Sequence, residues 1–221
     1  MVQGTTTPPQ ELVGYGSGRR TSPLPAPPTQ ARGVEKRDRL YDAAIARYRE
    51  AGIADTRVED VIADAEVSWA TFFRYFPRKE DVLLEGASRH FRHRVRAIAE
   101  RGLHDRRLKV QTVIERTFAA LLRPAELPPE LHNAALLEVF AHPARFAALV
   151  GDHPQPVIGL VAELLAEGQR RQEVRPDVDA GLAALALSAG CMFPAVQAAA
   201  VGADPVESAR QALEILWGGL E

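Results

Sequence analysis

The chain has 221 residues, of which 46% are hydrophobic and 25% are charged, values that are ordinary for a soluble protein of one or two domains. Its formal net charge of -2 excludes a general attraction to nucleic acid or to an anionic membrane, so a local basic patch would have to recognise either partner. The single cysteine, Cys191, excludes an intrachain disulfide and is typical of a reducing compartment. The first residues have no basic segment followed by an apolar core, so we expect no signal peptide and a cytoplasmic protein.

Residues 1–33 form a segment rich in Pro, Gly, Thr and Ser, which includes the run SPLPAPPTQARG. Such a composition buries too little apolar surface to offset the entropy lost on ordering, so we predict a disordered tail. The pair Arg19 and Arg20 could follow DNA as a flexible arm or could lie free in solvent.

After the tail, the apolar residues recur with helical spacing and no run alternates as in a strand, so the predicted fold class is all-α. A first helix is expected at about 36–51, and Gly52 would end it. The letters TRVE at 56–59 predict a capping box at the start of a short second helix. In such a box Thr56 accepts from a backbone N–H while Glu59 reaches back to the cap.

The rest of the chain continues the helical pattern. A short third helix is predicted at 69–76, with Ser68 as its N-cap and Pro77 after its end, and a long fourth helix follows at about 79–101. Further helices are expected at about 107–122, 129–141, 143–150, 155–172, 178–200 and 205–218.

The segment 180–203 carries no charged residue and is long enough to cross a bilayer. It is dominated by Ala, is interrupted by Gly, Ser, Pro and Gln, and has no flanking cluster of Lys or Arg to set an orientation. We therefore expect a buried helix here rather than a membrane span.

The stretch VSWATFFRYFPRKE at 67–80 is unusually aromatic for a chain with only 6% aromatic residues. On a helical wheel Phe72 and Phe76 coincide and are expected to anchor the third helix in a core, while Phe73 and Tyr75 fall at the rim. The opposite face is small and polar, and consists of Ala70, Thr71 and Arg74. That face could enter the major groove of DNA, which admits one α-helix.

The second and third helices together match the plan of a helix-turn-helix motif. A short helix, a break of about two residues and a second short helix make up this motif, and the second helix reads the bases. Helix N-termini near Thr56–Arg57 and near Arg78–Lys79 would flank the reading helix. Their unpaired N–H groups and positive dipole ends are suited to phosphate.

Residues 37–84 resemble the DNA-binding domain of the tetracycline-repressor (TetR) family of bacterial regulators. The matching segments are DAA at 42–44, Gly52, TRVEDV at 56–61, Ala65 and VSWATFFRYFPRKEDVL at 67–83. The resemblance implies three parts. These are the tail at 1–33, a helix-turn-helix DNA-binding domain at 34–94 with its motif at about 57–76, and a ligand-binding and dimerisation domain at 95–221.

The resemblance also places the contacts with DNA on the second and third helices. The family positions that match Tyr75 and Lys79 contact the DNA backbone. Together with the residues argued from the helical pattern, the predicted DNA-binding residues are Thr56, Arg57, Ser68, Trp69, Ala70, Thr71, Phe73, Arg74, Tyr75 and Lys79.

The sequence departs from the family pattern within the same stretch. Phe73 stands where a phosphate-contacting Tyr is usual, and Trp69 replaces a small or polar residue at the base-reading end. Trp69 could pack on thymine methyl groups or fold back onto the domain. Glu66 replaces the frequent glycine of the turn, and Arg78 replaces a frequent helix-capping residue. These departures favour an alternative function, a TetR-like helical binding module with weakened or lost DNA binding.

The resemblance implies a ligand-responsive regulator, most typically a homodimeric repressor. A small apolar or amphipathic effector would release it from a palindromic operator in double-stranded DNA. Apolar pockets between helices are common ligand sites. The predicted pocket residues are Phe118, Leu121, Phe140, Phe146, Met192 and Phe193. The predicted dimer interface uses the last two helices, including Val206, Leu213, Leu216 and Trp217, and involves no membrane.

The remaining motifs predict neither catalysis nor a cofactor nor a metal site. The run RHFRHRVR at 89–96 contains His90 and His93, but its four arginines would oppose a zinc ion, so a solvated basic helix face is expected. No G-x-S-x-G, H-E-x-x-H, C-x-x-C or phosphate-loop pattern occurs, which argues against an enzyme.

Overall fold

The computed structural model describes residues 28–123, 127, 129–151 and 155–220. These residues form helices and connecting turns, which confirms the predicted all-α class. The helices are α1 (Ala31–Asp55), α2 (Val58–Asp64), α3 (Trp69–Tyr75), α4 (Asp81–His90), the π-helical turn η1 (Phe91–Val95), α5 (Arg96–His104), α6 (Val110–Leu122), α7 (Pro129–Ala141), α8 (Pro143–Val150), α9 (Pro156–Arg170), α10 (Ala180–Ala200) and α11 (Pro205–Trp217).

The helix α1 is longer at both ends than the sequence pattern predicts. It begins at Ala31, so the end of the predicted tail is helical, while residues 1–27 of that tail lie outside the described residues. The backbone leaves the helical region at Gly52, where φ is 78°, before a last turn that ends at Asp55. The predicted stop at Gly52 is therefore a kink, because only glycine adopts such a φ without strain.

The predicted capping box at the start of α2 is wrong. The N-cap of α2 is Arg57, and no side chain caps this end. The Thr56 hydroxyl instead donates to the Gly52 carbonyl oxygen over 2.6 Å, so it satisfies the end of α1 and not the start of α2. By contrast, Ser68 caps α3 as predicted, since its Oγ accepts from the Thr71 N–H over 3.3 Å.

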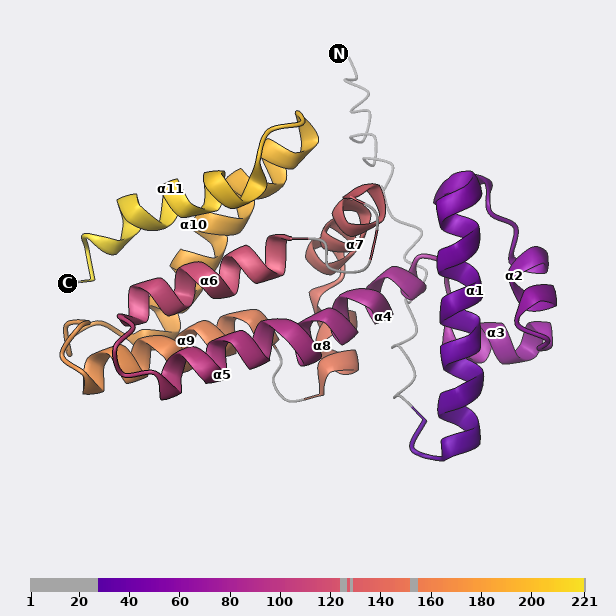
Figure 1. Ribbon diagram of the computed structural model, residues 1–221, viewed down its shortest axis with the longest axis horizontal. Helices are drawn as coiled ribbons and strands as arrows, with labels where there is room; N and C mark the ends of the chain where they lie inside the picture. The colour runs from indigo at the N-terminus through magenta and orange to yellow at the C-terminus, as the bar shows by residue number, and fades with distance from the viewer. Residues whose placement is uncertain (1–27, 124–126, 128, 152–154, 221) are drawn as a thin grey trace, which may run out of the picture.

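The helices α4, η1 and α5 form one long rod that runs from α1–α3 across the remaining helices (Figure 1). A small core lies between α1, α2, α3 and α4 and contains Leu40, Phe72 and Phe76. A larger core fills the bundle made by η1, α5, α6, α9, α10 and α11. Helix α7 contributes to both cores, because Leu131 and Ala135 belong to the small one and Leu136 to the large one. It is thus a packing bridge between the two ends of the molecule.

Among the described helices, α10 is long and apolar enough to cross a membrane. It packs against α9 and α11, and its Ala184, Leu187 and Cys191 are buried in the large core. Its other face exposes Leu182 and Phe193, each with about two thirds of its surface accessible (67% and 68%). The helix therefore has one face in the core and one apolar face on the outside of the protomer.

The end of α11 differs from the prediction for the dimer interface. Leu213 and Trp217 are buried in the protomer's own core, whereas Ile215 is 81% exposed and Leu216 is 37% exposed. Asp204 caps the N-terminus of α11, because its Oδ1 accepts from the Val206 N–H over 2.8 Å.

Candidate functional site

The helices α2 and α3 are joined by a tight turn centred on Glu66. The Glu66 N–H donates to the Ala63 carbonyl oxygen over 3.2 Å, and the Val67 N–H donates to the Ile62 carbonyl oxygen over 3.1 Å. Glu66 has a φ of 52°, in the left-handed region where a side chain is disfavoured. The glycine expected at this turn is therefore replaced by a residue under backbone strain.

We predict that Glu66→Gly stabilises the protein. The Glu66 side chain is exposed to solvent, so the substitution relieves the strain at little other cost. The expected gain in the free energy of unfolding is about 1 kcal/mol, measured by urea denaturation. Gln172→Gly is the matched control, since Gln172 has a φ of 61° in a loop far along the chain and should gain a similar amount. A loss of stability in Glu66→Gly alone would contradict this explanation.

The inner face of α3 anchors it to the small core as predicted. Phe72 and Phe76 are fully buried, and their ring centroids lie 5.9 Å apart. The outer face exposes Ala70 and Arg74, with Thr71 half-buried beside the Ser68 cap. The helix thus has the two surfaces inferred from its aromatic excess, one for packing and one open to solvent.

The departures from the family at Trp69 and Phe73 lie together on the exposed side of α3. The two rings stack with centroids 5.3 Å apart and an interplanar angle of 16°. Trp69 keeps 46% of its surface exposed, and Phe73 keeps 41%. Trp69 therefore folds back onto its own helix and still presents a flat apolar face to solvent.

Three predicted DNA-binding residues make contacts within the protein. Thr56 is buried, with its hydroxyl on Gly52. Tyr75 is also buried rather than at the rim, and its hydroxyl accepts from Arg74 Nη2 over 3.3 Å. The Lys79 Nζ donates to the Ala54 carbonyl oxygen over 2.7 Å, at the end of α1. The rim position predicted for Tyr75 is wrong because its ring fills space beside α1.

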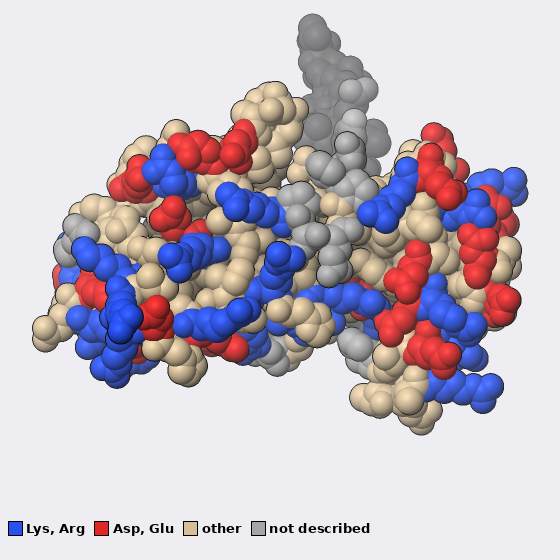
Figure 2. Space-filling model, viewed as in Figure 1, with Lys and Arg blue, Asp and Glu red and all other residues tan. Residues whose placement is uncertain are grey.

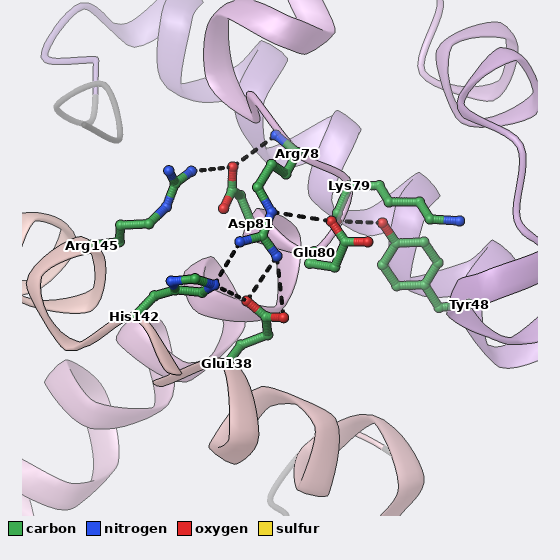
Figure 3. Close-up of polar contacts among 8 residues, drawn as sticks. All are labelled: Tyr48, Arg78, Lys79, Glu80, Asp81, Glu138, His142 and Arg145. Carbon is green, nitrogen blue, oxygen red and sulfur yellow. Dashed lines mark hydrogen bonds and ion pairs between the residues drawn. The ribbon is translucent and has the colours of Figure 1, made fainter. Parts of the chain in front are cut away.

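An interdomain cluster of polar side chains lies where α4 meets α7 and α8 (Figure 3). It consists of Arg78, Asp81, Glu138, His142 and Arg145. The guanidinium of Arg78 donates to both carboxylate oxygens of Glu138, over 3.0 and 3.2 Å, and its Nη1 lies 2.7 Å from His142 Nε2. The turn between α3 and α4 is therefore tied directly to the end of α7.

Asp81 forms the buried half of this cluster. It is fully buried, and its Oδ2 accepts from the Arg78 N–H over 2.8 Å and from Arg145 Nη2 over 2.6 Å. The first of these bonds fixes the turn before α4, whose N-cap, Glu80, has no side-chain cap. The second ties α4 to α8 through an ion pair in which Arg145 is only 8% exposed.

A cavity of about 640 Å³ lies between α4, η1, α7, α8, α9 and α10. Four of the predicted pocket residues line it: Leu121, Phe140, Phe146 and Met192. The other two do not. Phe118 is buried in the large core on the side facing α11, and Phe193 is 68% exposed on the outside of α10. The cavity volume is in the range of small-molecule sites.

Two polar residues that the sequence patterns did not single out also line this cavity, His132 from α7 and Ser188 from α10. His132 is 7% exposed and Ser188 is 6% exposed. Burial is the main cause that lowers the pKa of His132 below its ordinary value of 6.5, and the nearby His90 is the second cause. Neither residue belongs to a recognisable sequence motif, so only the fold shows that they line the cavity.

A second groove of about 600 Å³ lies beside the cavity, between α5 and α6. Arg94, Arg101, Arg116 and Arg123 line it, and basic side chains gather over these helices in Figure 2. Arg94 lines both hollows. The groove therefore offers positive charge next to the apolar cavity.

Comparison with known proteins identifies the helix-turn-helix region. Residues 40–85 match the family described as bacterial regulatory proteins, tetR family. The helix-turn-helix region of the chain is therefore similar to the DNA-binding domain of this family. YdgC of Bacillus subtilis, a helix-turn-helix-type transcriptional regulator, is 30% identical over 92 residues, which are 42% of this chain and 47% of that protein. The match spans about half the length of this curated relative.

Solved structures extend the likeness to the C-terminal helices. FadR of Thermus thermophilus, a TetR-family repressor crystallised with lauroyl-CoA, is 26% identical, with a TM-score of 0.69 over 84% of this chain and 95% of that one. FadR of Bacillus halodurans, a fatty acid degradation regulator, shares the fold at 22% identity, with a TM-score of 0.58 over 84% of this chain and 96% of that one.

Within the described residues no three His, Cys, Asp or Glu side chains group as a metal site. His90 is half-buried, with Nε2 2.8 Å from the Ala120 carbonyl oxygen, and His93 is exposed. Burial raises the pKa of the Cys191 thiol to about 12, so this thiol stays protonated.

Proposed function

We propose that the chain is a cytoplasmic, homodimeric repressor that leaves its operator when an amphipathic effector fills the cavity. The observation that carries this proposal is the double role of α7 and α8. Both helices line the cavity, and both hold the turn from which α4 leaves the DNA-binding domain. A ligand that moves these helices would therefore move α3.

The outer face of α3 suits the reading of DNA. Ala70 and Thr71 are small enough to let the helix approach base edges, and Arg74 can donate to guanine or to phosphate. The exposed Trp69 ring offers an apolar face for thymine methyl groups. Arg57 is exposed at the N-terminus of α2, where a phosphate would meet a cation and unpaired N–H groups.

The outer surfaces of α10 and α11 suit a second copy of the chain. Leu182, Phe193, Val201 and Ile215 are each at least two thirds exposed, which is unusual for large apolar side chains on a monomer. A two-fold dimer through these helices would bury them and would present two reading helices to successive major grooves, about 34 Å apart.

The effector is proposed to be an amphipathic molecule with a long apolar part. The cavity is lined mainly by apolar side chains such as Leu136, Phe146 and Met192. The FadR of Thermus thermophilus, which shares the fold over most of this chain, is bound to lauroyl-CoA. The arginine-lined groove beside the cavity could hold an anionic head group of such a ligand.

The experiment adds lauroyl-CoA to the purified protein and measures both thermal stability and operator binding. A ligand that binds only the folded state raises Tm. The proposal predicts a rise in Tm and a drop in operator affinity of roughly 10- to 100-fold. A rise in Tm without any loss of operator affinity would contradict effector-driven release, and the absence of both effects would exclude this class of effector.

Arg78→Ala is predicted to uncouple the two sites. The substitution removes the contacts with Glu138 and His142 but touches neither the outer face of α3 nor the cavity. We expect lauroyl-CoA and operator each to bind the variant about as well as the wild type, while lauroyl-CoA changes operator affinity by less than about 3-fold. Fluorescence anisotropy of labelled operator, with and without ligand, measures this.

Arg47→Ala is the control for that variant. Arg47 also forms an ion pair, with Asp64 over 2.6 Å, but both residues belong to the DNA-binding domain. The control should keep the full effect of ligand on operator affinity. If Arg78→Ala also keeps it, the interdomain cluster does not transmit the signal.

A second candidate function is a TetR-like helical binding module that no longer binds DNA. The absence of a hydroxyl at Phe73 and the stacking of Trp69 on its ring favour this alternative. It predicts that the cavity binds ligand while no operator is found. Binding to the DNA upstream of the protein's own gene separates the two functions.

A further inference from the structure

The cavity contains two buried polar residues whose hydrogen-bonding capacity is unused within the protein. His132 Nε2 and Ser188 Oγ are both shielded from solvent, and neither has a hydrogen-bond partner in the described part of the chain. Each residue is more than nine-tenths buried and lines the same cavity. A buried polar atom without a partner destabilises the fold, so such atoms are kept where something else pairs with them.

The His132 ring is set up to accept a hydrogen bond at Nε2. Burial keeps the ring neutral, since it lowers the pKa of His132 more than the Leu121 and Leu122 backbone raises it. Because Nε2 has no partner in the described part of the chain, we assign the ring N–H to the other nitrogen, Nδ1, on the side of these backbone groups. A neutral imidazole then offers a lone pair at Nε2, and only a donor can satisfy it.

Ser188 offers a hydroxyl, which can donate and accept. On a helix, a serine hydroxyl commonly bonds to the carbonyl of the preceding turn. Thr117 does so in this protein, since its Oγ1 donates to the Val113 carbonyl oxygen over 2.7 Å. Ser188 makes no such bond, so its hydroxyl, in a residue that lines the cavity, has no hydrogen-bond partner among the described residues.

The charged groups of the cavity lie elsewhere and are mostly occupied. Arg89 donates to Glu85 over 2.8 Å and to Asp38 over 2.5 Å, and its guanidinium lies over the Tyr41 ring. His93 and Arg94 are exposed. An anionic group of a ligand would therefore find its cations at the solvent side, and the pair His132 and Ser188 would meet an uncharged part of the molecule.

We propose that the effector carries an uncharged hydroxyl on its apolar part, which donates to His132 Nε2 or exchanges a hydrogen bond with Ser188. This inference rests on the proposed effector role of the cavity and narrows the class of ligand. A carbonyl or an ether has no proton to donate and leaves His132 unpaired. A plain alkyl chain leaves both residues unpaired, so the cavity discriminates in favour of hydroxylated chains.

The test compares two probes of equal size, 1-dodecanol and methyl undecyl ether, which differ in whether the oxygen carries a proton. Their affinities for the full-length protein are measured by displacement of a fluorescent apolar dye and by the shift in Tm. The wild type should bind the alcohol at least about 10-fold more tightly than the ether. In His132→Leu and Ser188→Ala this preference should fall toward equality.

Two further readouts separate recognition from a structural role. Ser188→Ala should be at least as stable as the wild type without ligand, because it removes a buried hydroxyl that lacks a partner. Val139→Ala, which shortens an apolar residue of the same cavity wall, should weaken both probes by the same factor and keep the preference. Ser188→Thr, which retains a hydroxyl, should restore the preference lost in Ser188→Ala.

Each outcome bears on one of the two proposals. If the wild type binds both probes with equal affinity, or if the variants keep the preference, the hydroxyl assignment is overturned while the cavity remains an effector site. If the wild type binds neither probe and lauroyl-CoA also leaves operator binding unchanged, the proposed effector function fails and the hydroxyl assignment fails with it.

Discussion

Ile215→Glu is expected to convert the proposed dimer into monomers and to reduce operator affinity by at least about 100-fold. Ile215 is 81% exposed on α11, so the substitution costs the folded protomer almost nothing. In a symmetric interface each dimer would bury two such carboxylates, and a penalty of about 3 kcal/mol corresponds to a roughly 100-fold weaker dimer. Analytical ultracentrifugation and operator titration measure the two effects.

Leu137→Glu provides the matched control for this variant. Leu137 is 55% exposed on α7, a helix outside the proposed interface of α10 and α11. The same change in charge and volume at this position should leave both the dimer and operator binding intact. If Ile215→Glu remains dimeric, α11 does not form the interface, and the spacing of the two reading helices must have another origin.

Asp81→Ala is expected to lower the free energy of unfolding by about 3–5 kcal/mol. Asp81 is fully buried, and its loss removes the carboxylate that Arg145 contacts over 2.6 Å in a site that is also closed to solvent. The same change removes the acceptor of the Arg78 N–H in the turn before α4. Urea denaturation, followed by circular dichroism, measures the loss.

The double variant Asp81→Ala with Arg145→Met tests whether this ion pair is the cause. Removing both charges takes away the buried guanidinium that the single variant leaves behind, so the double variant should recover a large part of the loss. Asp81→Asn, which keeps an acceptor for the Arg78 N–H but not the charge, should fall between the wild type and Asp81→Ala. Equal stability of the single and double variants would show that the loss of stability comes mainly from the hydrogen bond to the Arg78 N–H and not from the ion pair.

The helix-turn-helix region could be predicted from sequence because its signals are local. The Ser68 cap, the spacing of Phe72 and Phe76 and the position of α2 all depend on residues within one or two turns of each other. The capping box failed at Thr56 for a local reason too, because Arg57 is the N-cap of α2 and the partner of the Thr56 hydroxyl is the Gly52 carbonyl, not an N–H of α2. Sequence spacing alone does not decide between such partners.

The interdomain cluster and the interior of the cavity could not be predicted, because they depend on contacts distant in sequence. Arg78 and Glu138 are 60 residues apart, and no periodic pattern connects them. The prediction of pocket residues from size and apolarity found Phe140 and Met192 but also included Phe118 and Phe193, since an amphipathic pattern does not say which buried face meets a hollow. His132 and Ser188 were missed for the same reason.

Operator binding measured as a function of salt tests the central claim most directly. The protein is titrated onto a labelled duplex from the DNA upstream of its own gene, with the variants Ala70→Glu and Arg74→Ala. Arg170→Ala serves as control, because Arg170 lies exposed on α9. If α3 lies in the major groove, operator affinity should fall steeply as the salt concentration rises. Ala70→Glu should then abolish operator binding, and Arg74→Ala should weaken it. Absent binding, binding insensitive to salt, or full binding by Ala70→Glu would contradict this placement of α3.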